Sequence, residues 1–221
     1  MARKRVAILI SGRGANMAAL IAAARNPDYP ADIAVVISNR PDAGGLQRAR
    51  AEGIATAVID QTEFRKDREG FERSVEEVLE AHGTDIMCLA GFMRLLSPAL
   101  VTRWGGRMLN IHPALLPSFK GLHTHERALE AGVKIHGATV HFVVPEVDAG
   151  PIVAQAAVPV LDDDTADTLA ARVLAVEIRI YPLALDLVAS GRSTLAAQGL
   201  VYNAAAVSPA AQLIVPDPKQ A

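Results

Sequence analysis

Short hydrophobic runs alternate, through the first half of the chain, with longer stretches in which hydrophobic positions recur every three or four residues. The short runs are rich in Val and Ile, a pattern typical of buried β-strands. They lie at residues 5–11, 33–38, 56–59, 85–91 and 107–111. The longer stretches have the spacing of amphipathic helices and lie at residues 15–25, 44–52, 64–82 and 97–104. This alternation predicts an α/β fold of the Rossmann-like class, with a doubly wound, mostly parallel sheet and helices on both faces.

After the fifth strand the pattern changes. Residues 124–132 predict one more helix, ended by Gly132. Residues 137–144 alternate like a half-buried strand, and residues 151–160 follow after a short turn. Two strands joined in this way predict an antiparallel pair at the C-terminal side of the sheet.

A long helix is predicted for residues 162–190, with Asp and Thr residues at its start and Gly191 directly after its end. No linker or internal repeat interrupts the order of elements, so we expect residues 1–195 to form one domain. Residues 196–221 are rich in Ala and Pro and predict a loose tail.

Composition and charge exclude several classes of protein. With 51% hydrophobic residues, the 221-residue chain is typical of a globular protein that buries a core. Its formal net charge of −2 argues against a nucleic-acid-binding surface. No hydrophobic run reaches the roughly 18 residues of a membrane span. The single cysteine, Cys88, lies in a hydrophobic run as a core residue, so we expect a cytoplasmic protein without disulfides. Nothing in the sequence decides between a monomer and a homodimer.

A glycine loop, ISGRGANM at residues 10–17, joins the first strand to the first helix. Gly12 and Gly14 let the backbone turn tightly, and the N–H groups at the start of the helix would face an anion. The Asn16 side chain would be an added donor. The loop therefore predicts a phosphate site, and a tight turn without a ligand is the alternative.

The same loop argues against a dinucleotide. Met17 stands where the fingerprint G-x-G-x-x-G has its third glycine. The second strand ends in Ser38-Asn39-Arg40, without the acid that binds a ribose in dinucleotide-binding folds. A phosphomonoester therefore fits better than NAD.

Asn110 and His112 end the fifth strand, in the segment LNIHPALLP. Because side chains alternate along a strand, the two point to the same face. An amide donor beside an imidazole would stabilise an oxyanion, and Pro113 and Pro117 would hold the pair rigidly. A buried histidine with an ordinary hydrogen bond is the alternative.

A third group strengthens the catalytic interpretation. Asp148 lies in the turn between the two late strands, in VDAGPIV. A carboxylate there would pair with His112 and favour its charged form, or take up a proton released during a reaction.

Four segments together carry a resemblance to a known family. They are ISGRGAN (10–16), AGFMRLLSP (90–98), LNIHPALLPSFKGLHTH (109–125) and HGATVHFVVPEVDAGPIV (136–153). The chain resembles the formyltransferases that use 10-formyltetrahydrofolate, over roughly residues 6–190. Within them it is most similar to the branch that formylates the amine of glycinamide ribonucleotide in purine biosynthesis.

The resemblance implies a role for each candidate catalytic residue. Asn110 and protonated His112 would stabilise the oxyanion that forms when the substrate amine attacks the formyl carbon. Asp148 would hold His112 charged and help to remove the amine proton, through water. The family reaction needs no metal and no covalent enzyme intermediate.

The resemblance also implies nucleotide binding by the N-terminal half and folate binding and catalysis by the C-terminal half. The residues implied for the ribonucleotide are Gly12, Arg13, Gly14, Ala15, Asn16 and Glu177. The residues implied for the folate are Arg68, Met93, Arg94, Leu95, Leu96, Asn110 and Val143. By residue type alone, Glu177 and Arg68 would be ordinary exposed helix charges.

Three positions depart from the usual family pattern. Ala15 and Ala114 stand where Ser is usual. The change at Ala15 removes one hydroxyl directed at the phosphate, and the change at Ala114 leaves the catalytic trio untouched. Arg13 replaces a more usual polar residue, and its guanidinium would add a phosphate contact.

The remaining histidines do not indicate a metal site. His123 and His125 lack a third ligand at a recognised spacing. His141 would face either the cleft or solvent, and His82 and His136 are expected at the surface.

Rival functions stay open. Methionyl-tRNA formyltransferase shares the catalytic segment but has an extra C-terminal domain and a basic surface, which we do not expect here. Formyltetrahydrofolate deformylase, a hydrolase, shares parts of the late strands but normally carries an N-terminal regulatory domain, and it has no need of a phosphate loop. A non-catalytic module that senses folate or a phosphorylated metabolite is an alternative of a different class.

Overall fold

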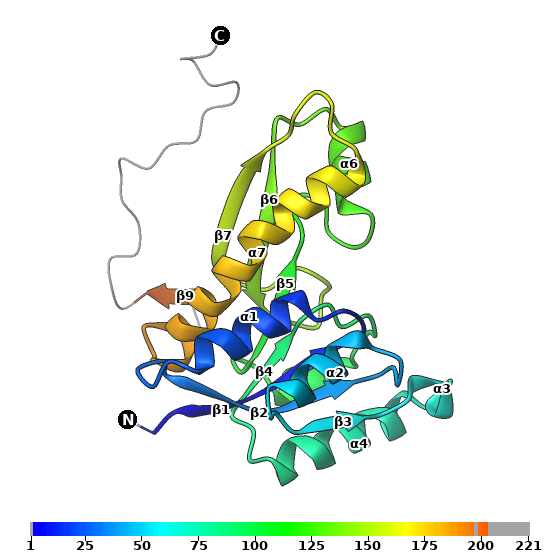
Figure 1. The fold of residues 1–221 in the computed structure, drawn as a ribbon, viewed down its shortest axis with the longest axis vertical. Coiled ribbons are helices and arrows are strands. Elements are labelled where there is room, and N and C mark those ends of the chain that lie inside the picture. The colour runs from blue at the N-terminus through cyan, green and yellow to red at the C-terminus, as the bar shows by residue number, and fades with distance from the viewer. Residues whose placement is uncertain (1, 197–198, 203–221) are drawn as a thin grey trace.

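A seven-stranded sheet forms the centre of the computed structural model, which describes residues 2–196 and 199–202 (Figure 1). The strand order is β3, β2, β1, β4, β5, β6, β7. The strands are β1 (Lys4–Ile10), β2 (Ala31–Ser38), β3 (Thr56–Val58), β4 (Ile86–Leu89), β5 (Met108–His112), β6 (Ile135–Phe142) and β7 (Ile152–Pro159). Strands β1 to β5 pair in parallel, whereas β6 and β7 join antiparallel. This arrangement confirms the predicted fold class, including the antiparallel pair.

Helices cover both faces of the sheet (Figure 1). They are α1 (Ala15–Ala24), α2 (Gly44–Ala51), α3 (Gln61–Phe64), α4 (Arg68–Ala81), α5 (Pro98–Arg103), α6 (Thr124–Glu130) and α7 (Ala166–Ala189). Hydrophobic residues of α1, α2, α6 and α7 belong to one core, and those of α4 and α5 to a second. Along β1, Ile8 and Ile10 face the first core while Leu9 faces the second. The continuous hydrophobic runs in the sequence therefore reflect strands buried on both faces.

The helix predicted at residues 64–82 is two helices in the structure. α3 ends at Phe64, and α4 begins at Arg68. Between them, the Asp67 side chain accepts a hydrogen bond from the Gly70 N–H at 2.8 Å. An aspartate that captures a backbone N–H in this way starts a new helix and ends the previous one.

An antiparallel hairpin follows α7. It consists of β8 (Ser193–Ala196) and β9 (Gly199–Tyr202). The predicted tail at residues 196–221 therefore contains one strand of this hairpin, and its residues 197–198 and 203–221 lie outside the described part of the chain. Within the described residues, no helix combines the length and the apolar character that crossing a membrane requires.

The strand order brings three connections to one edge of the sheet. β1, β4 and β5 are neighbours and run in parallel, so the segments that follow them leave from the same edge. Two of these segments are named here for their predicted ligands: the phosphate loop (residues 12–16, after β1) and the folate loop (residues 91–97, after β4). The third is the segment at residues 113–121, which follows His112.

Candidate active site

His112, the last residue of β5, is held from both sides of its ring. Its Nδ1 lies 3.3 Å from Oδ2 of Asp148, and its Nε2 lies 2.9 Å from the carbonyl oxygen of Phe119. Only 5% of the residue is exposed. Because a carboxylate and a carbonyl can only accept hydrogen bonds, both contacts are satisfied when both ring nitrogens carry a proton. The geometry therefore favours a positively charged ring.

Asp148 reaches His112 from the loop between β6 and β7. Its backbone is left-handed, with φ 51°, a conformation that aspartate and asparagine tolerate better than most residues. Its Oδ2 also accepts a hydrogen bond from the Gly121 N–H at 2.8 Å. The carboxylate thus joins the segment after β5 to the loop after β6.

Asn110 pairs with His141, which lies opposite it on β6. Asn110 Nδ2 is 3.3 Å from His141 Nε2, and His141 Nδ1 is 2.9 Å from the Phe142 carbonyl oxygen. Burial lowers the pKa of His141, although the Phe142 carbonyl and Asp148 act in the opposite direction. A neutral ring that donates through Nδ1 and accepts through Nε2 matches these partners. His141 therefore faces the site rather than solvent, and it orients the Asn110 amide.

The phosphate loop needs glycine at residue 14. Gly14 has φ 72°, and a Cβ there would lie 3.0 Å from the Met17 methyl group and 3.1 Å from Gly45 Cα. Helix α1 begins directly after it, at Ala15, so its first N–H groups are available to an anion. Arg13 is exposed beside them. The loop thus has the geometry expected of an anion site.

Asn16 and Glu177 form a buried pair, although they are 161 residues apart in the sequence. The Asn16 amide donates to Glu177 Oε2 at 2.7 Å, and each residue is at most 9% exposed. Burial raises the pKa of Glu177, while the Asn16 hydrogen bond and the charge of His112 lower it. The interpretation of Glu177 as an ordinary exposed helix charge is therefore wrong. The donor that we assigned to a phosphate is engaged with Glu177 here.

The folate loop presents hydrophobic side chains to solvent. Met93 and Leu95 are 69% and 64% exposed. The Arg94 guanidinium lies 4.2 Å from the centre of the Phe71 ring on α4. Arg68 is exposed at the first turn of the same helix, Leu96 is partly buried, and Val143 packs at the edge of the second core. The implied folate residues are therefore near α4 and the carboxyl end of β4, and their exposed apolar groups suit a planar heterocycle.

Comparison with known proteins decides the family. Residues 4–185 match the family model described as formyl transferase. The chain belongs to the formyl transferase family. The resemblance found in the sequence is thereby confirmed.

Individual formyl transferases are similar over most of this chain. The phosphoribosylglycinamide formyltransferase of Escherichia coli (strain K12) is 46% identical over 85% of this chain and 88% of its own length. The trifunctional purine biosynthetic protein adenosine-3 of Bos taurus is 52% identical over 90% of this chain. The chain spans only 20% of that protein's length.

Solved structures agree with this assignment. Phosphoribosylglycinamide formyltransferase from Brucella melitensis is 56% identical, with a TM-score of 0.81, over 86% of this chain and 97% of that one. A formyltetrahydrofolate deformylase from Pseudomonas syringae is 29% identical, with a TM-score of 0.83, over 90% of this chain and 66% of that one. The fold therefore accommodates both a transferase and a hydrolase.

The structure of this formyl transferase corrects the prediction for His136. The residue is fully buried, with its ring 5.4 Å from that of His125. Burial and the neighbouring His125 lower the pKa of His136 to about 4. Among the described residues, no group of three or more potential metal ligands is found.

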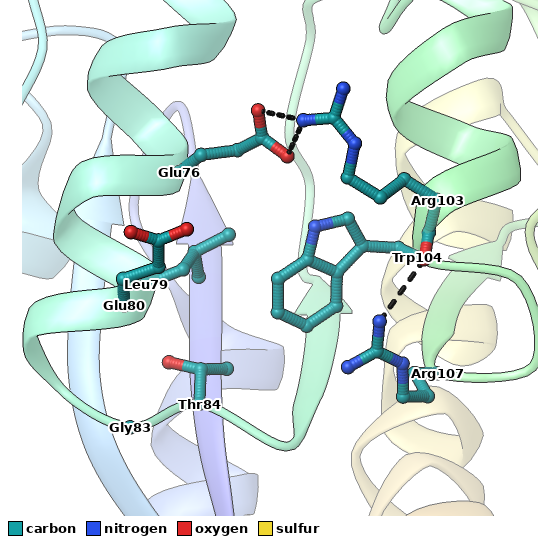
Figure 2. Close-up of a pocket in the computed structure, with 8 residues that line it drawn as sticks. All are labelled: Glu76, Leu79, Glu80, Gly83, Thr84, Arg103, Trp104 and Arg107. Atoms are coloured by element: carbon teal, nitrogen blue, oxygen red, sulfur yellow. Dashed lines mark hydrogen bonds and ion pairs between the residues drawn. The ribbon is translucent and has the colours of Figure 1, made fainter.

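A separate surface cleft of about 260 Å³ lies between α4 and α5 (Figure 2). Glu76 and Arg103 form an ion pair across it, and the Arg107 guanidinium lies 4.5 Å from the Trp104 ring centre. The cleft adjoins the segments that precede β4 and β5, at the opposite edge of the sheet from the formyl transferase site. None of the predicted site residues lines it.

The sequence did not predict two contacts of this site, that of Asn110 with His141 and that of His112 with the Phe119 carbonyl. His141 was left undecided between the cleft and solvent, and the register of β5 with β6 would have placed it opposite Asn110. The Phe119 carbonyl is a backbone group in a segment of irregular conformation, so no side-chain pattern indicates it. The roles of Asn110, His112 and Asp148 stay predictions, although the structure brings these three residues together.

Proposed function

We propose that this formyl transferase transfers the formyl group of 10-formyltetrahydrofolate to the amine of glycinamide ribonucleotide, a step in purine biosynthesis. The products are formylglycinamide ribonucleotide and tetrahydrofolate. The observation that carries the proposal is His112, fixed between Asp148 and the Phe119 carbonyl and two residues from Asn110 on one strand. The names and coverage of the bacterial relatives support this substrate pair. Because both substrates are small and soluble, we infer a cytoplasmic location.

The proposed chemistry needs negative charge to be stabilised on one oxygen. The folate supplies the formyl group, and attack by the ribonucleotide amine gives a tetrahedral intermediate. We propose that the Asn110 amide donates a hydrogen bond to the oxygen of this intermediate, and that His112 places a positive charge beside it. Asp148 keeps His112 charged and accepts the amine proton through water, before that proton reaches the folate nitrogen that leaves.

The contacts of His112 define how it acts. Both ring nitrogens already have partners, so in this arrangement the ring contributes its charge rather than a free N–H. A direct hydrogen bond to the substrate oxygen requires the Phe119 carbonyl to leave Nε2. Such an exchange involves the segment at residues 113–121 and not β5 itself.

Separate groups of residues would bind the two substrates. We propose that the phosphate loop and Arg13 hold the ribonucleotide phosphate, and that Glu177 contacts the ribose hydroxyls or the amine side of the substrate. We propose that the folate loop, Asn110 and Val143 hold the folate heterocycle, and that Arg68 pairs with the carboxylates of its glutamate tail.

The test is an assay at the folate chromophore, with and without glycinamide ribonucleotide. A signal that requires the ribonucleotide supports the transferase. The likeness to a formyltetrahydrofolate deformylase makes hydrolysis the second candidate, and folate release without the ribonucleotide would identify it. Absence of a signal in both arms rules out both enzymes and leaves a binding module.

A further inference from the structure

Ser11 connects the phosphate loop to the folate loop. It follows β1 directly and is 7% exposed. Its backbone N–H donates to the Gly91 carbonyl at 3.1 Å, and its hydroxyl accepts from the Met93 N–H at 2.7 Å. Two hydrogen bonds thus join the residue before the phosphate loop to the first half of the folate loop.

The direction of these hydrogen bonds is fixed by a buried asparagine. The Ser11 hydroxyl donates to Asn39 Oδ1 at 2.7 Å, and Asn39 Nδ2 donates to Gln61 Oε1 at 2.8 Å. Asn39 is 1% exposed. Because the hydroxyl has one proton and gives it to Asn39, its lone pair is left for the Met93 N–H. Asn39 stands where dinucleotide-binding folds have a ribose acid, and here it serves as an internal support.

The side chains on either side of Met93 in the folate loop pack on one ring of α4, because Phe92 stacks on Phe71 and the Arg94 guanidinium lies over the same ring. Met93 and Leu95 are largely exposed, so their side chains contribute little packing. The other end is anchored independently, because Ser97 donates its backbone N–H and its hydroxyl to the buried Glu72 carboxylate. Packing on Phe71 thus holds the neighbouring side chains, and the Ser11 hydroxyl orients the Met93 peptide by accepting its N–H.

We propose that Ser11 is a positioning residue that couples the ribonucleotide and folate sites, an inference that rests on the proposed function. A phosphate bound at residues 12–16 orders the start of the phosphate loop. Because the Ser11 hydroxyl bonds the Met93 N–H, this ordering also restricts the Met93 peptide in the folate loop. Each substrate then binds more tightly when the other is present, because part of the ordering entropy has already been lost.

The test measures binding without reaction. Tetrahydrofolate lacks the formyl group, so its dissociation constant can be measured by calorimetry with and without saturating glycinamide ribonucleotide. In the wild type we expect the ribonucleotide to tighten tetrahydrofolate binding about fivefold or more. In Ser11→Ala we expect weaker tetrahydrofolate binding. We also expect a ratio near one between the dissociation constants without and with the ribonucleotide. Asn39→Ala, which removes the acceptor of the Ser11 hydroxyl, should reduce the ratio as well.

Ser97→Ala is the matched control, since it removes one hydroxyl from the other anchor of the same loop. It should weaken tetrahydrofolate binding and leave the ratio at its wild-type value. The coupling is overturned if the ratio is one in the wild-type protein. It is also overturned if a folded Ser11→Ala protein has the same ratio as the wild type. Thermal melting shows whether each variant is folded. The proposed function fails separately, if the wild type produces no formylated ribonucleotide.

Discussion

At the scale of single residues, two groups are held in unusual states, one in the candidate site and one in the core. Asp148 has a left-handed backbone, and His136 is a histidine buried without exposure to solvent. Each state costs free energy that the surrounding structure must supply. Substitutions at these residues can therefore separate charge from conformation.

Asp148→Asn should lower turnover by about 10²- to 10⁴-fold, the usual contribution of a positioned acid or base. Asparagine tolerates the left-handed backbone and keeps an oxygen for the Gly121 N–H, so only the charge beside His112 is lost. Steady-state kinetics, with a melting curve as the control for folding, measure the effect. Turnover near that of the wild type would contradict the role of Asp148.

His136 should make the protein less stable in mild acid. Its folded-state pKa of about 4 is lower than the ordinary value of 6.5, so the unfolded chain binds the proton more tightly. The stabilisation is complete above pH 6.5 and decreases as the pH falls from there toward 4. Between pH 7 and pH 5 this one group should account for about 1–2 kcal/mol of the lost free energy of unfolding.

His136→Phe is the variant that tests this dependence, because it keeps a buried ring and removes the titration. Urea unfolding at pH 7 and pH 5 should give a smaller decrease for the variant than for the wild type. Equal decreases would show that other groups, including His125 and His141, cause the effect.

At the scale of elements, the turn between β1 and α1 sets the geometry of the phosphate loop. Gly14 requires a left-handed backbone with close neighbours, whereas a Cβ at Gly12 would meet nothing within 4 Å. Gly14 is therefore required by the fold, whereas Gly12 is not, and we propose that Gly12 instead leaves room for a phosphate.

Gly14→Ala should lower the free energy of unfolding by about 1–2 kcal/mol, the cost of a left-handed conformation for a residue with a Cβ. Gly12→Ala should leave stability nearly unchanged and raise KM for the ribonucleotide, because its methyl group occupies space beside the bound phosphate. Urea unfolding and initial rates separate the two effects. Equal losses of stability in both variants would contradict this division.

At the scale of the whole molecule, α7 crosses the sheet and links the two halves of the site. It carries Glu177, which meets Asn16, and Tyr181, which is fully buried. The Tyr181 hydroxyl lies 3.0 Å from the Leu89 carbonyl oxygen and 3.1 Å from the Leu109 carbonyl oxygen. One side chain thus contacts the last residue of β4, from which the folate loop follows, and the second residue of β5.

Tyr181→Phe should lower the free energy of unfolding by about 1–2 kcal/mol, since it removes a buried hydroxyl whose proton is shared between two carbonyl oxygens. Tyr29→Phe is the matched control, because its hydroxyl bonds the Pro182 carbonyl in a partly buried place where water can substitute. Its effect should be smaller. Chemical denaturation of the two variants measures the difference, and a larger loss in Tyr29→Phe would contradict the assignment.

Much of the architecture is predictable from the sequence by itself. Hydrophobic periodicity determined the succession of strands and helices along the chain, and the antiparallel pair was evident from the alternation at residues 137–144. The positions of Asn110, His112 and Asp148 at strand ends and in a turn were evident too, because these features are local. The break at Asp67 was missed, since a capping side chain overrides a helical pattern that continues through it.

Only the tertiary structure decided the contacts between segments that are far apart in the chain. The pairing of Asn110 with His141 depends on strand register, and the pairing of Asn16 with Glu177 depends on how α7 packs beside α1. The burial of His136 likewise results from packing around the segment after β5. Residue type and spacing carry no information about such partners, because burial and hydrogen bonding are set by the neighbours that folding brings together.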